Sequence, residues 1–155
     1  MRLALTLALA TLAVVAMPCA AMAEPSTPAV EERRQPPAAG DAQSEYNRGV
    51  RARVAANWTE AVAAFRSAIA LRPAFPEAWN ELGFALRNQG KYPDSLKAYD
   101  EALRIRPDFP EALEYLGEAY VKLGRMDDAR KVLDRLKPLD AARAAELSEA
   151  IDKGK

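Results

Sequence analysis

The sequence predicts an all-α fold, a tandem array of three helical hairpins closed by one further helix. Two observations predict it. The segment RPAFPEA, which begins at Arg72, recurs as RPDFPEA from Arg106, 34 residues later and with six of seven positions identical. Within each unit, apolar residues return every three or four positions, which is the spacing of one helix face. A period of this length is typical of helical repeat arrays, in which a single hairpin cannot bury its apolar face alone.

The composition of the chain argues against several classes of function. The chain has 155 residues, with 22 Lys and Arg against 22 Asp and Glu, so no net charge attracts nucleic acid or an anionic membrane. Histidine, the commonest general base and metal ligand, is absent, and Cys19 is the one cysteine. The sequence also contains no glycine-rich phosphate loop and no calcium loop. We therefore expect no catalytic residue, no metal site and no cofactor.

The first 23 residues have the pattern of an export signal. Arg2 precedes an uncharged apolar run from Leu3 to Met17, and small residues then end at Ala23. The run is shorter than the roughly 20 residues of a membrane span. We expect cleavage near Ala23 and a periplasmic mature chain. Cys19 leaves a lipid-anchored form as an alternative, which Pro18 disfavours because a small residue belongs before an acylated cysteine.

The remaining chain divides by composition. Residues 24–41 hold four prolines and few apolar residues, which predicts a flexible linker. The three repeats are expected at about 42–75, 76–109 and 110–138, and a C-terminal capping helix within 139–155. In that last segment Asp140 can cap the helix, and its apolar stripe would cover the open end of the third hairpin. The stripe is Ala144, Leu147 and Ile151.

The second unit shows how each hairpin is built. Pro76 suits the first turn of a helix, where its missing N–H has no partner to lose. Gly90 suits the end of that helix because it adopts a positive φ without strain. Pro93 and Pro107 then bound the second helix. The apolar positions of the two helices are Trp79, Leu82, Ala85 and Leu86, followed by Leu96, Tyr99, Ala102 and Leu103.

The other two units follow this register less completely. The first unit has Arg48 and Ala56 where the second has Leu82 and Gly90. It retains Gly49, Ala61, Phe65, Ala68 and Pro73. The third unit retains Leu116, Gly117, Tyr120, Gly124, Ala129 and Leu133, but it ends three residues early, at Pro138.

This register resembles the tetratricopeptide repeat (TPR) family over about residues 42–137. The second unit carries nearly the whole family signature, in Trp79, Leu82, Gly83, Leu86, Tyr99, Ala102 and Pro107. The resemblance implies a right-handed α-solenoid of three TPR hairpins with a capping helix. It also implies a binding scaffold that is not an enzyme, with a peptide or protein segment held against the first helices of the units.

Reading the inner positions of those first helices gives a candidate partner-binding groove. It consists of Tyr46, Val50, Arg53, Asn80, Phe84, Arg87, Glu111, Glu114 and Glu118. The order predicts an aromatic and basic end followed by an acidic end. One family subclass clamps a C-terminal carboxylate with Lys and Asn from the first unit and basic residues from the third. Here Tyr46 and Val50 replace the first pair and Glu111 and Tyr115 the last, which favours a partner segment with a basic stretch instead.

The leading hypothesis is therefore a periplasmic protein-interaction scaffold. The alternative is a self-assembling, homo-oligomeric subunit of an envelope complex. We expect neither nucleic-acid binding nor a membrane span.

Overall fold

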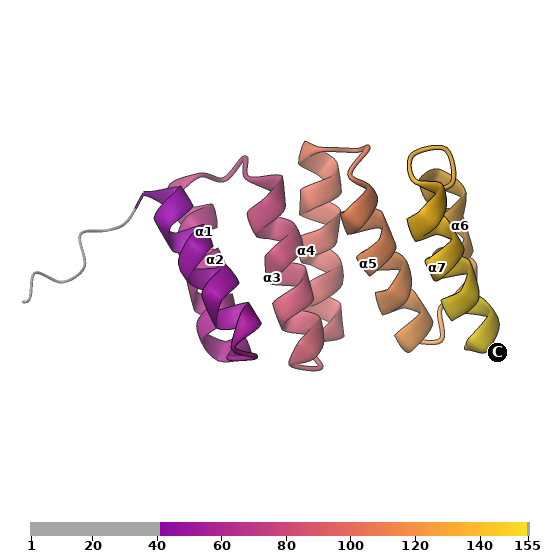
Figure 1. The fold of residues 1–155 in the computed structure, drawn as a ribbon, viewed down its shortest axis with the longest axis horizontal. Coiled ribbons are helices and arrows are strands. Elements are labelled where there is room, and N and C mark those ends of the chain that lie inside the picture. The colour runs from indigo at the N-terminus through magenta and orange to yellow at the C-terminus, as the bar shows by residue number, and fades with distance from the viewer. Residues whose placement is uncertain (1–40, 155) are drawn as a thin grey trace, which may run out of the picture. The chain divides into compact units, whose positions relative to one another are not determined.

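The computed structural model describes residues 41–154, which form a row of helical hairpins (Figure 1). The predicted signal peptide and all of the predicted linker except Asp41 lie outside the described residues. No strand occurs within 41–154. The helices are α1 (Ala42–Val54), α2 (Trp58–Leu71), α3 (Pro76–Asn88), α4 (Tyr92–Ile105), α5 (Pro110–Lys122), α6 (Met126–Leu136) and α7 (Ala141–Lys153). The predicted α-solenoid with a capping helix is confirmed.

Six of the seven described helices begin in one of two ways. Asp41, Asn57 and Asp140 cap α1, α2 and α7 by accepting a hydrogen bond from a backbone N–H of the first turn, at 2.8, 3.2 and 3.0 Å. By contrast, α3, α4 and α5 lack a side-chain cap and have proline in their first turn. Both devices address the same backbone N–H groups that a helix start leaves without partners.

The turns between paired helices share a left-handed residue. Gly90 has a φ of 74° and Gly124 a φ of 70°, and no neighbour would contact a Cβ at either. Ala56 occupies the same place in the first hairpin with a φ of 52°. A residue with a Cβ is strained in this region by about 1 kcal/mol. Ala56 in place of glycine therefore makes the first turn less favourable in energy, but the backbone takes the same left-handed conformation.

Close packing inside the hairpins depends on a small residue facing a large one. A Cβ on Gly49 would lie 2.5 Å from the Phe65 ring, and one on Gly83 would lie 2.6 Å from the Tyr99 ring. Both rings are fully buried. In the third unit the equivalent Gly117 faces Leu147, which belongs to α7. The capping helix thus packs into the α5–α6 hairpin and buries its stripe, with Leu147 only 1% exposed.

Candidate binding groove

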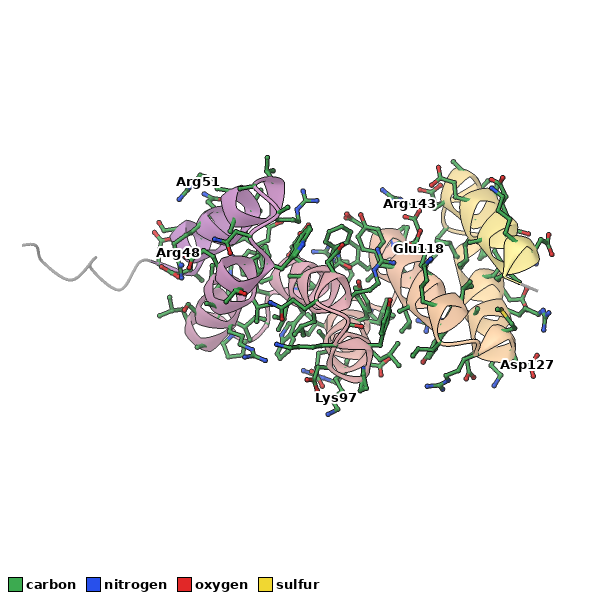
Figure 2. The ribbon with its side chains drawn as sticks, turned by 90° about the horizontal axis from the view of Figure 1, so that it is seen from below. Arg48, Arg51, Lys97, Glu118, Asp127 and Arg143 are labelled. Carbon is green, nitrogen blue, oxygen red and sulfur yellow. The ribbon has the colours of Figure 1, made fainter. Side chains whose placement is uncertain are left out.

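The first helices of the units, α1, α3 and α5, together with α7, form one side of the array, and α2, α4 and α6 form the other. Figure 2 separates the two sides: Glu118 and Arg143 lie along one, and Lys97 of α4 and Asp127 of α6 along the other. The predicted groove residues all belong to α1, α3 and α5. The helices that carry them therefore lie on one side of the array, as the repeat register requires.

Aromatic rings occupy the centre of this surface. The half-buried Phe84 ring lies 6.0 Å from the Trp58 ring, edge-on, and 5.2 Å from the Tyr115 ring. Tyr115 in turn lies 6.3 Å from Tyr99, which is buried beneath it. Separations of this kind are favourable for aromatic pairs. We call Trp58, Phe84 and Tyr115 the aromatic floor.

An arginine at the C-terminal end of each of α1 and α3 reaches across to the next first helix. Arg53 of α1 forms an ion pair with Glu81 of α3, with 3.1 Å between Nε and Oε2, and its guanidinium lies 5.6 Å from the Phe84 ring. Such a cation over a ring adds to the attraction of the ion pair. One helix is thereby tied to the next through one carboxylate and one ring.

The α3–α5 junction also contains one arginine, one carboxylate and one aromatic ring, but the carboxylate and the ring occupy each other's repeat positions. Arg87 of α3 pairs with Glu118 of α5 and lies 5.3 Å from the Tyr115 ring. In the 34-residue register, Glu81 corresponds to Tyr115, and Phe84 corresponds to Glu118. Acid and ring have therefore swapped positions between the two junctions, while the arginine stays fixed. We call these two arrangements the arginine clips.

The α5–α7 junction has an ion pair without such a clip. Glu114 of α5 pairs with Arg143 of α7, and the Glu114 side chain is almost fully buried. Val121 stands where the earlier units have Arg53 and Arg87. A short apolar residue thus ends the series of arginines.

These contacts change the predicted groove in two respects. Asn80 and Glu114 were expected on its open surface, but they are buried, with only 1% and 4% of their surface exposed. Arg53, Arg87 and Glu118 were expected to form the charged ends, but each is held in an ion pair. The charges therefore largely neutralise one another from helix to helix.

The remaining predicted residues keep a surface for a partner. Tyr46, Val50, Phe84 and Glu111 are all partly exposed. Glu111 forms no ion pair with any residue of 41–154. Tyr46 packs against Phe75 with 5.0 Å between ring centroids.

Buried carboxylates shape the electrostatics near the N-terminal ends of α3 and α5. Burial raises the pKa of Glu81, and the neighbouring Arg53 opposes this. Burial likewise raises the pKa of Glu114 against the effect of Arg143. Burial, then the negative charges of Glu81, Glu77 and Glu111, raises the pKa of Tyr46 to about 12.

Tyr115 responds in the same way. Its pKa rises to about 12 through burial and then through Glu111, Glu114 and Glu81. Both tyrosines therefore remain neutral at physiological pH, beside several carboxylates. This edge of the groove is suited to hydrogen-bond donors and cations.

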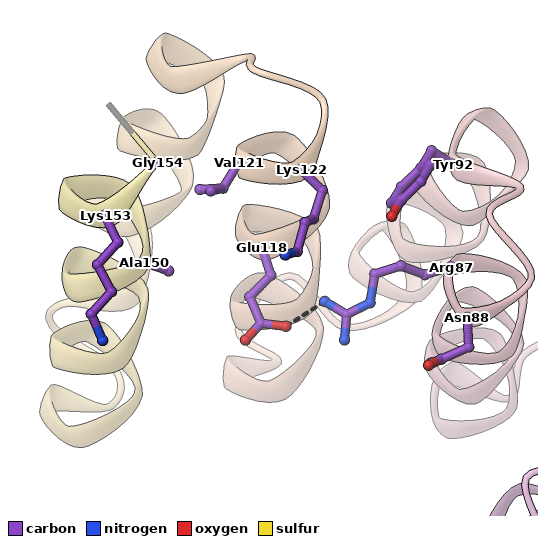
Figure 3. Close-up of a pocket in the computed structure, with 9 residues that line it drawn as sticks. All are labelled: Arg87, Asn88, Tyr92, Glu118, Val121, Lys122, Ala150, Lys153 and Gly154. Carbon is purple, nitrogen blue, oxygen red and sulfur yellow. Dashed lines mark hydrogen bonds and ion pairs between the residues drawn. The ribbon is translucent and has the colours of Figure 1, made fainter.

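A pocket of about 520 Å³ lies at the opposite edge, toward the C-terminal ends of the first helices (Figure 3). Its floor is on α5, and its walls come from α3 and the start of α4 on one side and from α7 on the other. The lining residues are Arg87, Asn88, Tyr92, Glu118, Val121, Lys122, Ala150, Lys153 and Gly154. The groove predicted from the sequence included no residue of α7, whereas Ala150 and Lys153 of that helix line this pocket.

A signal for that contribution exists in the sequence. Ala144, Leu147 and Ile151 follow Leu113, Leu116 and Tyr120 by 31 residues each. The capping helix therefore repeats the pattern of a first helix at a shortened interval. A search at a strict 34-residue period does not detect it.

The fold and its inner surface define a helical-repeat protein. The family model of the tetratricopeptide repeat matches residues 46–108 and 82–145, which together span well over half of the chain. The protein belongs to the tetratricopeptide repeat family. No curated protein sequence is significantly similar to it.

Solved structures with the same fold include the TPR2B domain of yeast Sti1 in its pHsp70 complex. It has a TM-score of 0.69 and 20% identity, with 73% of this chain and 94% of that chain covered. The first TPR of Spaghetti (RPAP3) bound to the HSP90 peptide SRMEEVD has the same TM-score at 16% identity, covering 73% and 91%. MamA is 27% identical with a TM-score of 0.60, covering 74% of this chain and 63% of MamA.

Residues 41–154 contain no group of three or more side chains placed to hold a metal ion. Within the same range, no helix has the length and apolarity needed to cross a bilayer.

Proposed function

We propose that the protein is a non-enzymatic interaction scaffold that holds an extended segment of a partner protein in the groove of α1, α3, α5 and α7. The observation that carries this is the aromatic floor. Phe84 and Tyr115 remain partly exposed on the inner surface, where they contact each other with 5.2 Å between ring centroids, whereas Tyr99 beneath them is fully buried. Partly exposed aromatic residues are frequent anchors of binding energy.

The chemistry of the groove supports a partner segment with a basic residue. Glu111 has no ion-pair partner among the described residues, and the neutral hydroxyls of Tyr46 and Tyr115 lie near it. A lysine or arginine of the partner would supply the missing cation. The Sti1 structure is a pHsp70 complex, and the RPAP3 structure is bound to an HSP90 peptide. At the positions of a carboxylate clamp this chain has Tyr46, Val50, Glu111 and Tyr115, so we propose a different class of peptide.

The site of action is proposed from residues 1–23 alone. An uncharged apolar run followed by small residues supports export and cleavage near Ala23, hence a periplasmic scaffold. Mass spectrometry of the mature protein tests this: an N-terminus at Glu24 agrees with the proposal, and an acylated Cys19 contradicts it.

The test of binding starts with crosslinking of the wild-type protein in the native envelope and identification of the captured partner. Phe84→Ala combined with Arg87→Ala should then weaken binding of that partner by about thirtyfold to a thousandfold, since two anchors of about 1–2 kcal/mol each are lost. Isothermal titration calorimetry measures the change.

The matched control is Arg104→Ala, which removes an exposed arginine paired with Glu101 on α4, outside the groove. Circular dichroism should show the same helix content in all variants. Binding that survives the double substitution would remove the groove as the partner site.

Self-assembly remains the alternative function. Sedimentation of the purified protein over a wide concentration range distinguishes it. A monomer at all concentrations excludes a homo-oligomeric role.

A further inference from the structure

We infer that the pocket between α3 and α7 receives an acidic side chain, Asp or Glu, of the segment held in the groove. This rests on the proposed function and adds to it a second anchoring point of opposite charge. Glu111, which is proposed to meet a basic residue, lies in the first turn of α5, and the pocket lies at the other end of the same helix. A partner would thereby be fixed in orientation across the groove.

The charges around the pocket favour an anion. Arg87, Lys122 and Lys153 line it, and Glu118 is the one carboxylate among the lining residues. Glu149 also approaches, because it forms an ion pair with Lys153 at 2.6 Å. Three cations against these two carboxylates leave an excess of one positive charge. A single carboxylate from a partner would balance it.

Lys122 carries that excess for a structural reason. On α4 and α6, Lys97 and Lys131 each pair with an aspartate three residues earlier on the same helix, and Lys137, just after α6, pairs with Asp134. The carboxylate four residues before Lys122 is Glu118, but Glu118 is drawn across the junction to Arg87. Lys122 therefore forms no ion pair within residues 41–154.

Helix dipoles alone do not account for this arrangement. Cations near helix C-termini offset the partial negative charge there. That effect places Arg87, Lys122 and Lys153 near the ends of their helices, but it creates no cavity. Here a hollow of about 520 Å³ lies among the three cations, with Val121, Ala150 and the Tyr92 ring as apolar walls (Figure 3).

The position of Arg87 favours a side chain over a chain terminus. Its guanidinium lies 5.3 Å from both the Phe84 and Tyr115 rings, and its side chain is only 16% exposed. A segment lying over the aromatic floor would pass this guanidinium and continue along the groove. An acidic side chain could enter the pocket from that path, with one charge-assisted bond to Lys122 and another to a free N–H of Arg87.

The experiment is an NMR titration of the mature protein with three short peptides. The probe AEFEA is acetylated and amidated, so its only carboxylates are side chains. AKFKA, blocked in the same way, tests the opposite charge, and acetylated AAFAA with a free C-terminus tests a terminal carboxylate. We expect AEFEA to shift the signals of Arg87, Lys122 and Lys153, and Lys122→Glu or Lys122→Gln to weaken its binding by about tenfold. Lys97→Glu on the outer side is the control and should leave binding unchanged.

Three results would overturn the inference. They are an absence of shifts at the pocket with AEFEA, equal binding there by AKFKA, and tighter binding there by the free terminus of AAFAA. If AKFKA shifts Tyr46 and Glu111 while AEFEA leaves the pocket unchanged, the proposed function stands and this inference falls. If no peptide binds and no partner is captured in the envelope, both fall.

Discussion

The first hairpin, α1–α2, and the second, α3–α4, adopt the same structure although their sequences match the family signature to different degrees. The second carries nearly the full family signature, whereas the first has Arg48 and Ala56 at two signature positions. Both nevertheless place a glycine against a fully buried ring, Phe65 in the first and Tyr99 in the second. The contact between small and large residues therefore maintains the hairpin, and other signature positions tolerate change.

The two hairpins differ in the details around that contact. The Tyr99 hydroxyl is buried and has no hydrogen-bond partner among the described residues, whereas Phe65 has no polar atom to satisfy. The first hairpin has the strained alanine in its turn, and the second has glycine there. Each hairpin thus contains one unfavourable feature that the other lacks.

Removal of the rings should have the largest effect. Tyr99→Ala and Phe65→Ala should each destabilise the protein by about 3–5 kcal/mol, because each leaves a large cavity in a closed core. In a repeat array stability is transmitted between neighbours, so the two losses should spread differently. Hydrogen exchange should show loss of protection confined to α1 and α2 for Phe65→Ala, and spread over α1 to α6 for Tyr99→Ala. Equal spreading would show that the first hairpin does not open independently.

Removing the hydroxyl from Tyr99, or adding one to Phe65, should change the free energy of unfolding by a smaller amount, with opposite sign in the two hairpins. Tyr99→Phe should stabilise the protein by about 1 kcal/mol because it removes a buried group without a partner. Phe65→Tyr should destabilise it by about 1–3 kcal/mol because it introduces such a group. Urea denaturation measures both. A loss of stability in Tyr99→Phe would mean that the hydroxyl is satisfied by bound water.

Exchange of the turn residues should have the smallest effect. Ala56→Gly should stabilise the protein by up to about 1 kcal/mol, since glycine adopts the left-handed conformation without strain. Gly90→Ala should cost about 1 kcal/mol for the same reason, with no steric contribution because no neighbour lies near the new Cβ. Thermal denaturation of the two variants provides the comparison. Changes of equal sign would contradict the conformational explanation.

The array could be predicted from the sequence because each unit repeats the same local signals. Residues that begin and end helices recur at the same repeat positions, and so do the apolar residues that pack between helices. Pro76 and Pro110 begin helices, Gly90 and Gly124 end them, and Asp140 caps α7. These features act locally and can be recognised from neighbouring residues. The helix-forming region could therefore be predicted nearly completely.

The groove could be predicted only in part, because exposure and charge pairing depend on the spacing between helices. Asn80 and Glu114 fall in the correct register but are buried in the folded array. The pairing of Arg87 with Glu118 joins residues 31 positions apart, on different helices. The role of Lys122 follows from that pairing, so it too requires the three-dimensional structure.

The arginine clips also have a mechanical consequence. Each clip ties one first helix to the next on the inner side alone, so it opposes any straightening of the array that would widen the groove. A partner that draws Glu118 or Arg87 away from the other would release this restraint at one joint only. Ligand binding would then be coupled to the curvature of the array through these two ion pairs. Salt screens the more exposed charges of these ion pairs, so the array would bend more easily at high ionic strength.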